Sequence, residues 1–178
     1  MAVPGVAYNQ KFSDHLIINQ MKSTNQIGLD KVKSKSLAGG LNNLLADYMM
    51  FYQNTRGLHW NIKGEKFFEL HLKFEELYTD LLVKVDEVAE RILTLGAIPL
   101  HTFDDYQNAA KIQSVKNISD GNQGVQSILE AFETIILKQR ELLALSSDAE
   151  DEGTNALMSD YIREQEKLVW MYSSFLNQ

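Results

Sequence analysis

The chain has 178 residues, of which 44 % are hydrophobic and none is cysteine, and its formal net charge is −7. This length fits one domain whose core is large enough to fold without a disulfide or a structural metal. The lack of cysteine excludes a disulfide scaffold, a zinc–cysteine site and a thiol nucleophile, and the acidic balance disfavours a broad basic surface for nucleic acid. No apolar run is long enough to span a membrane and no secretory leader pattern is present, so we expect a cytoplasmic protein without a membrane partner.

The first 36 residues are polar and contain more lysine than acidic residues. They lack the regular apolar spacing of a core helix, although a short helix over 12–21 would fit. We therefore expect an N-terminal extension over 1–36 and one helical domain over 37–178.

Proline occurs only at Pro4 and Pro99, so most of the chain contains nothing that forbids a helix. Apolar residues recur at spacings of three and four among strong helix formers, and no stretch alternates like a strand. Helices are predicted over 36–61, 67–95, 104–110, 121–145 and 154–176. Because the 96–120 connection is long, this order predicts an all-α, antiparallel four-helix bundle with a short helix in the crossover.

The predicted helix over 67–95 has three faces on a helical wheel. Its core stripe consists of Leu70, Phe74, Leu77, Leu81, Val85, Val88 and Ile92. The opposite face is charged and is expected to meet water; it consists of Glu69, Lys73, Glu76, Asp80, Lys84, Glu87 and Arg91. Between them lies a second apolar strip, formed by Phe68, Leu72, Leu82, Ala89 and Leu93. Either a wide core face or packing against another subunit would explain this strip.

The second apolar strip also contains residue types that bind metals. His71 and Glu75 are four residues apart, as are Asp86 and Glu90, so each pair projects from one side of the helix. Glu75 and Asp86 are separated by about 16 Å along the axis, which is too far to share one ion within a chain. A second copy, antiparallel about a two-fold axis near 80–81, would place each pair opposite the other and create two identical sites.

Each of these residues also has a simpler explanation. A single acidic residue on a helix usually faces solvent, and a histidine among apolar neighbours is more often an interior residue than a ligand. The combination is harder to explain, because burying it without a partner would be costly. Imidazole and carboxylate groups without thiolate suit iron, manganese or zinc.

Two stretches of sequence provide a more specific signal. The first is His59-Trp60-Asn61-Ile62-Lys63-Gly64, followed by Leu70-His71 and Glu75. The second is Asp86-Glu87-Val88-Ala89-Glu90-Arg91, followed by Leu95-Gly96 and Pro99. Over roughly 37–178 the chain resembles the Dps family, the DNA-binding proteins from starved cells, within the ferritin-like group.

The resemblance implies a hollow homododecamer that oxidises Fe(II), preferably with hydrogen peroxide, and stores ferric mineral inside. It implies ferroxidase centres between subunits, with His59, His71 and Glu75 from one chain and Asp86 and Glu90 from the other as iron ligands. Many members have Asp where this chain has Glu75, so the carboxylate here stands on one more methylene. Two irons oxidised together would pass two electrons to one peroxide and yield water.

The resemblance gives a further meaning to Trp60 and to the acidic link over 148–152. Trp60 is similar to the family's tryptophan beside the centre, where it either donates electrons or only packs. The link contains Asp148, Glu150, Asp151 and Glu152. It is either a solvated loop before a helix or, as in the family, part of a negative three-fold pore that admits iron.

Three other functions can be weighed against the same residues. A ferritin-type centre inside one bundle uses Glu-x-x-His motifs, and none of the four histidines follows a glutamate by three residues. A mainly structural, DNA-compacting role needs clustered Lys or Arg, whereas the chain has only scattered N-terminal lysines and no basic C-terminal tail, so strong DNA binding is not expected. A plain helical interaction module would leave the two carboxylate pairs unexplained.

Overall fold

The computed structural model describes residues 23–177. Its helices are α2 Lys31–Asn61, α3 Phe67–Thr94, α4 Phe103–Ala109, α5 Gly121–Asp148 and α6 Glu152–Phe175. The four predicted long helices and the short one in the crossover are therefore confirmed, with ends shifted by a few residues. The short helix expected over 12–21 lies outside the described residues.

Helix α2 begins at Lys31 rather than at residue 36, because Asp30 caps it. The Asp30 carboxylate accepts hydrogen bonds from the backbone N–H groups of Val32 and Lys33, which the first turn cannot pair internally. Residues 31–36 are therefore helical although they lack apolar spacing. The division into an extension over 1–36 and a domain over 37–178 stays a prediction.

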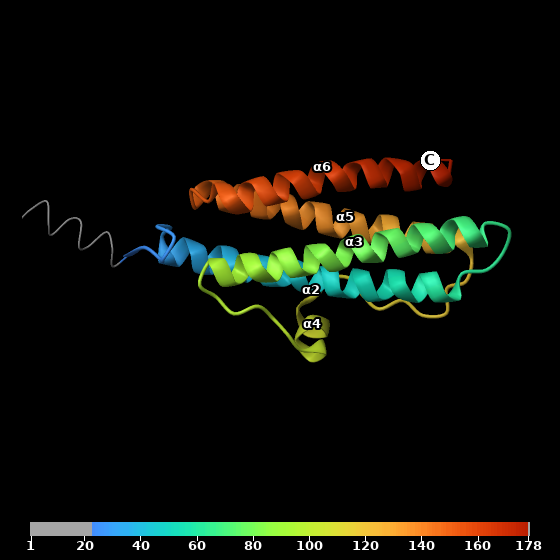
Figure 1. Ribbon diagram of the computed structural model, residues 1–178, viewed down its shortest axis with the longest axis horizontal. Coiled ribbons are helices and arrows are strands. Elements are labelled where there is room, and N and C mark those ends of the chain that lie inside the picture. Colours follow the sequence, from blue (N-terminus) through green and yellow to red (C-terminus); the bar gives the residue numbers. More distant parts are fainter. Residues whose placement is uncertain (1–22, 178) are drawn as a thin grey trace, which may run out of the picture.

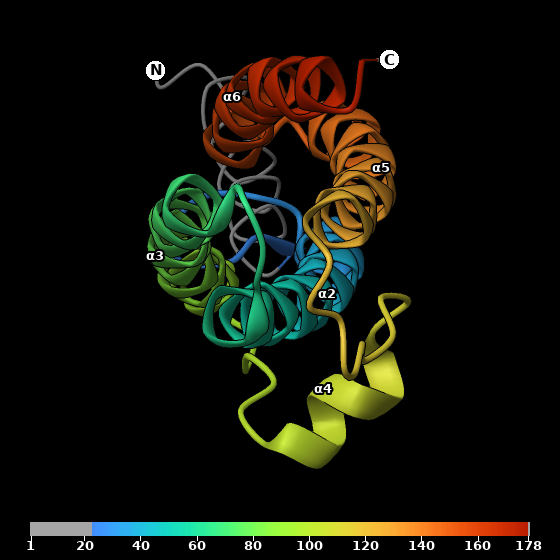
Figure 2. The same cartoon turned by 90° about the vertical axis from the view of Figure 1, so that its right-hand side faces the viewer.

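The four long helices form a bundle in which neighbouring helices run antiparallel (Figure 1). Helix α2 packs along α3, and α5 packs along α6. The crossover between α3 and α5 spans the bundle and carries α4, which lies outside the four helices and against α2 (Figure 2). The predicted architecture, an all-α four-helix bundle with a short helix in the crossover, is confirmed.

The bundle interior is apolar and closely packed. The predicted core stripe of α3 is buried, apart from the half-buried Val85. The rings of Phe51 and Phe132 meet edge to face with centroids 5.0 Å apart, a favourable arrangement for aromatic pairs. Within residues 23–177, no helix is long and apolar enough to cross a membrane.

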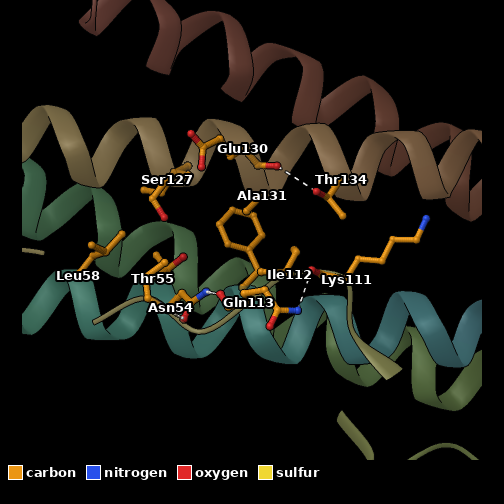
Figure 3. A pocket seen from close by; sticks show the side chains of 13 residues that line it. Asn54, Thr55, Leu58, Lys111, Ile112, Gln113, Ser127, Glu130, Ala131 and Thr134 are labelled. Atoms are coloured by element: carbon orange, nitrogen blue, oxygen red, sulfur yellow. Dashed lines mark hydrogen bonds between the residues drawn. The ribbon is translucent and has the colours of Figure 1, made fainter. Parts of the chain in front are cut away.

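Two side chains of α2 fasten the crossover to the bundle. The buried Asp47 carboxylate accepts hydrogen bonds from the backbone N–H groups of Lys111 and Ile112, at 2.6 and 2.9 Å. The Asn54 amide donates to the Gln113 carbonyl and accepts from the Val115 N–H. These contacts replace the hydrogen bonds that the irregular segment cannot make with itself. A pocket of about 230 Å³ lies under this segment, between α2 and α5 (Figure 3).

The charged face of α3 was expected to meet water, and this prediction is wrong for Lys84, whereas the other residues of that face are exposed or half-buried. Lys84 is only 4 % exposed, and its ammonium group donates to Asp80 at 2.9 Å and to Glu164 of α6 at 3.1 Å. One turn later, the hydroxyl group of Tyr161 in α6 donates to Glu87 at 2.5 Å. The backbones of α3 and α6 lie further apart than those of α2 and α3 (Figure 2), so long polar side chains fill the gap.

Candidate metal centre

Two histidines from different helices come together beside the second apolar strip of α3. His59 lies at the end of α2 and His71 in the first turns of α3. Their rings stack with centroids 3.7 Å apart. The Nδ1 atom of each ring lies 2.8 Å from the backbone carbonyl oxygen of the other residue. The two helices are therefore joined by a reciprocal pair of histidine hydrogen bonds.

These hydrogen bonds determine which nitrogen can bind a metal. A carbonyl oxygen only accepts, so each Nδ1 must carry the proton and donate it. In a neutral ring, Nε2 then keeps a free lone pair, which is the form of imidazole that coordinates a cation. A backbone carbonyl holding the other nitrogen is also how proteins orient ligating histidines. His59 and His71 thus form a preorganised pair of nitrogen donors.

The three predicted carboxylate ligands remain exposed on α3. Glu75, Asp86 and Glu90 are solvent-exposed, and their carboxylates have no hydrogen-bond or ion-pair partner within residues 23–177. The apolar residues around them are also exposed, reaching 84 % for Phe68. The second apolar strip is therefore not a wide core face. Apolar side chains interleaved with unpaired carboxylates are typical of a surface that a partner and a cation cover.

One chain alone does not assemble a complete centre. Within the described residues 23–177, no three His, Asp or Glu side chains converge on a point that could hold a metal ion. Helix α3 is continuous from Phe67 to Thr94, so the His71–Glu75 and Asp86–Glu90 pairs stay well separated along it. That the pairs meet across two chains, and that these five residues are the ligands, stays a prediction.

Two tyrosines near the histidines were missed by the sequence reasoning. The ring of Tyr78 meets His59 edge to face at 5.3 Å, and it meets the ring of Tyr52 at 6.1 Å. The signal was present, because Tyr78 follows His71 by seven residues and Tyr52 precedes His59 by seven. A spacing of seven places two residues on the same helix face.

Trp60 is 59 % exposed, and its ring faces the guanidinium group of Arg56 at 4.9 Å. Arg56 also lies over the ring of Tyr52 and donates to its hydroxyl group at 2.9 Å. The side chains near His59 are thus an ordered group of aromatic rings with one arginine. This group lies on the same side of the bundle as the histidine pair.

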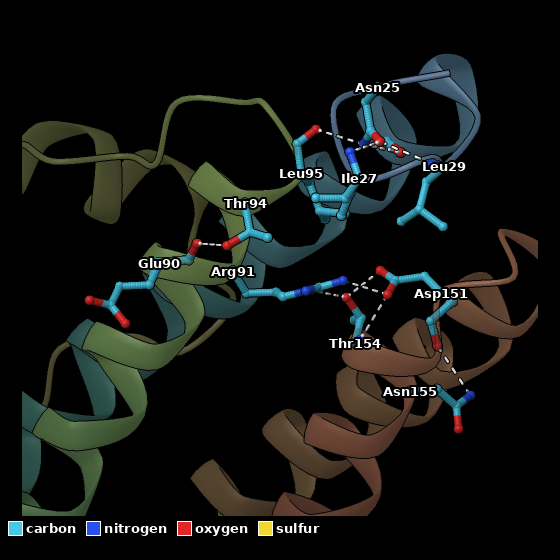
Figure 4. A network of polar contacts seen from close by, with 12 residues as sticks. Asn25, Ile27, Leu29, Glu90, Arg91, Thr94, Leu95, Asp151, Thr154 and Asn155 are labelled. Carbon is cyan, nitrogen blue, oxygen red and sulfur yellow. Dashed lines mark hydrogen bonds and ion pairs between the residues drawn. The ribbon is translucent and has the colours of Figure 1, made fainter. Parts of the chain in front are cut away.

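The acidic residues of the link over 148–152 differ in burial and in pairing. Asp151 is only 2 % exposed; it caps α6 and pairs with Arg91 of α3 at 2.5 Å, while Arg91 also donates to Thr154 (Figure 4). The Asp151 carboxylate therefore already has its partners within the chain. Asp148, Glu150 and Glu152 are exposed, and Asp148 forms a surface ion pair with Lys33. Whether these three line a pore stays a prediction.

Sequence comparisons agree with this geometry. The family model for the ferritin-like domain matches residues 38–178. An uncharacterized protein of Haemophilus influenzae is 52 % identical over 152 residues, covering 85 % of this chain and 95 % of that protein. The DNA protection during starvation protein of Porphyromonas gingivalis is 38 % identical over 148 residues, covering 83 % of this chain and 93 % of that protein.

Solved structures show the same relationship. The Dps protein from Vibrio cholerae O1, described as a ferritin-like diiron-carboxylate protein, superposes with a TM-score of 0.86 at 56 % identity, over 86 % of this chain and 97 % of that one. The Dps protein of Bacillus brevis reaches 0.79 at 30 % identity, over 82 % and 97 %. The fold is thus a ferritin-like bundle of the diiron-carboxylate group. Within that group, the chain belongs to the Dps family.

Proposed function

We propose that this protein stores and detoxifies iron. It oxidises Fe(II), preferably with hydrogen peroxide, and deposits the ferric product inside a hollow homododecamer with 23 symmetry. The ferroxidase centres form between two antiparallel copies of α3. In each centre, His59, His71 and Glu75 of one chain meet Asp86 and Glu90 of the other. A cytoplasmic location is part of the same proposal.

The histidine pair is the single observation that supports this proposal most strongly. Its hydrogen bonds hold each Nδ1 against a backbone carbonyl, so that in the neutral ring each Nε2 is available to a cation. One helical turn after His71, the exposed carboxylate of Glu75 has no partner within residues 23–177. Nitrogen donors bind Fe(II), and carboxylate oxygens favour the smaller and more highly charged Fe(III). A mixed set of this kind binds the substrate and also promotes its oxidation.

The exposed apolar strip explains why two copies would assemble around the centre. Phe68, Leu72, Leu82 and Leu93 are each at least half exposed, and a two-fold axis would bury both copies of this surface together. That burial also removes Asp86 and Glu90 from water. The bound cation then compensates the carboxylate charge that desolvation would otherwise penalise.

A mixing experiment tests the shared centre. One variant combines His59→Ala with His71→Ala, and another combines Asp86→Ala with Glu90→Ala; each alone should lose rapid peroxide-driven Fe(II) oxidation. If the two are dissociated, mixed and reassembled, random pairing makes about half of the dimers mixed. Each mixed dimer has one intact centre, so about a quarter of all centres should recover.

Both variants must first be shown to assemble, because a failure to form shells would abolish activity for another reason. Stopped-flow absorbance of ferric species measures the recovery. Unmixed variants carried through the same dissociation and reassembly are the matched controls. If mixed shells recover no activity, the ligands do not act across two chains and the proposed centre is wrong.

DNA protection is consistent with this chemistry without strong DNA binding. The Porphyromonas gingivalis relative is named for protecting DNA during starvation, and removing iron together with peroxide would protect DNA by preventing radical formation. Of the N-terminal lysines, Lys33 is already paired with Asp148. A mainly structural, DNA-compacting role remains the alternative, and a gel-shift assay distinguishes the two.

A further inference from the structure

We propose that Tyr78, with Tyr52 behind it, donates an electron to hydrogen peroxide when a centre holds only one Fe(II). This inference rests on the proposed ferroxidase function and adds a role that the ligands cannot perform. It starts from the aromatic rings that contact the histidine pair. Phe67 lies against His71 at 5.0 Å and Tyr78 against His59 at 5.3 Å, and of these two rings only Tyr78 has an oxidisable hydroxyl group.

The ring contacts form a continuous path away from His59. Tyr78 lies edge to face with the His59 ring at 5.3 Å, and Tyr52 lies edge to face with Tyr78 at 6.1 Å. Both separations are within the range of direct aromatic contact. Both tyrosines are half-buried, so they are shielded from bulk solvent yet close enough to it to exchange a proton.

Electron balance shows why such a donor is useful. Reduction of one hydrogen peroxide to two waters consumes two electrons and two protons, whereas one Fe(II) supplies only one electron. Without a second donor, Fe(II) and hydrogen peroxide give Fe(III), hydroxide and a hydroxyl radical. With Tyr78, Fe(II), hydrogen peroxide, the tyrosine and one solvent proton give Fe(III), two waters and a neutral tyrosyl radical. The phenol supplies both the second electron and the second proton.

The position of Arg56 makes Tyr78 the better donor than Trp60. The guanidinium group lies over the Trp60 ring at 4.9 Å, and it is always charged at accessible pH. A fixed positive charge on a ring face opposes loss of an electron from that ring. Arg56 also faces Tyr52 at 5.8 Å, so we expect the radical to rest on Tyr78 and to reach Tyr52 only in part.

The test uses assembled protein loaded anaerobically with Fe(II) at one or two equivalents per centre, followed by one equivalent of hydrogen peroxide and rapid freezing. Electron paramagnetic resonance should show a tyrosyl radical at one equivalent and a much weaker signal at two. Tyr78→Phe keeps the ring and its packing but removes the oxidisable hydroxyl group. It should lose the signal, and a spin trap should then detect more hydroxyl radical.

Tyr172→Phe is the matched control, because Tyr172 packs against Phe132 in the bundle and should leave the signal unchanged. Trp60→Phe should also retain it. A wild-type signal in Tyr78→Phe, or its loss in Trp60→Phe, would overturn the inference. Should Tyr78→Phe fail to assemble, peptide mapping of the unmodified protein after repeated turnover decides the question. Oxidation of Tyr78 before Trp60 supports the inference, and the reverse order contradicts it.

The experiment separates failure of the proposed ferroxidase function from failure of the proposed role of Tyr78. If peroxide produces no ferric absorbance in the unmodified protein, the ferroxidase function itself is wrong. If ferric absorbance appears at one equivalent without any tyrosyl radical, only the role of Tyr78 is wrong.

Discussion

Helix α3 has two polar flanks whose charged residues are used in opposite ways. On the flank that faces α6, Lys84, Glu87 and Arg91 pair with groups of the same chain, and Lys84 is buried. On the other flank, Asp86 and Glu90 are exposed and have no such partner within residues 23–177. Residues next to each other in sequence therefore serve different purposes, because successive positions on a helix point about 100° apart.

This difference distinguishes charged residues that stabilise the fold from charged residues that are free to bind a partner or a cation. A charge satisfied inside its own chain stabilises the bundle, and removing it leaves a partner unpaired. A carboxylate left unpaired on an exposed apolar strip contributes little to the stability of the isolated chain. We expect such a carboxylate to act only when the proposed partner subunit and cation cover it. Five predictions follow from this distinction, in order of decreasing effect.

The largest effect is expected on activity from the exposed flank. Asp86→Ala combined with Glu90→Ala should slow peroxide-driven Fe(II) oxidation on the order of 100-fold or more, since loss even of supporting residues costs about 10–100-fold at metal sites. The secondary structure by circular dichroism should not change. Glu65→Ala combined with Glu133→Ala removes two other exposed carboxylates and should leave the rate intact. Equal losses in both double variants would refute a specific site.

On the paired flank, the largest loss of stability is expected from Asp151→Ala. This change removes the cap of α6 and leaves Arg91 without its carboxylate (Figure 4), and together these should cost about 2–4 kcal/mol. Urea unfolding at a fixed protein concentration measures it. Asp148→Ala breaks only an exposed ion pair with Lys33 and should cost less than about 1 kcal/mol. A similar cost for both would mean that burial of Asp151 is unimportant.

Lys84→Met keeps the packing of a long side chain but removes the ammonium group between Asp80 and Glu164. Because both carboxylates are partly exposed, the expected cost is about 1–2 kcal/mol at neutral pH. Lys73→Met, on an exposed residue paired with Glu76, is the control and should cost less than about 0.5 kcal/mol.

The same residue predicts a pH dependence. Burial alone would lower the pKa of Lys84, but its hydrogen bonds and attraction to Asp80 and Glu164 outweigh burial and raise the pKa above its usual 10.5. A raised pKa stabilises the folded state at pH values below 10.5, and this stabilisation is lost as the pH rises through the folded-state pKa. The stability difference between the unmodified protein and Lys84→Met should therefore shrink only above about pH 10.5. A difference that shrinks between pH 7 and 9 would contradict this account.

The smallest effect is expected on DNA. The net charge is −7, and Lys33 is already paired on the surface, so retardation in a gel-shift assay should be weak at low salt and absent at moderate salt. Strong retardation at moderate salt, lost when residues 1–36 are deleted, would show that the N-terminal lysines bind phosphate. The DNA-compacting alternative would then gain support.

Much of the fold could be predicted because its signals are local. Apolar spacing defined α3 and α5 to within a few residues, and Gly121 and Phe67 were placed correctly as helix starts. The start of α2 was missed because it depends on the Asp30 cap rather than on apolar periodicity. The burial of Lys84 was missed for a different reason: a helical wheel shows which residues share a face but not how far away the neighbouring helix lies.

The candidate site also has one part that the sequence predicts and one part that depends on packing between helices. The placement of His71, Glu75, Asp86 and Glu90 along one strip of the helix could be predicted from the sequence, because a helix converts spacing directly into direction. The approach of His59 to His71, their reciprocal hydrogen bonds and the contact of Tyr78 with His59 depend on how α2 packs against α3.

By itself, the sequence determined an all-α bundle and placed His71, Glu75, Asp86 and Glu90 along a second apolar strip of one helix, since both follow from periodicity along single helices. Only the tertiary structure showed that this strip is exposed, which nitrogen of each histidine donates to a backbone carbonyl, that Asp151 and Lys84 pair within the chain, and which aromatic rings contact the histidine pair. Those properties depend on the distances between groups on different helices. Burial and hydrogen bonding follow from these distances and not from the order of residues along the chain.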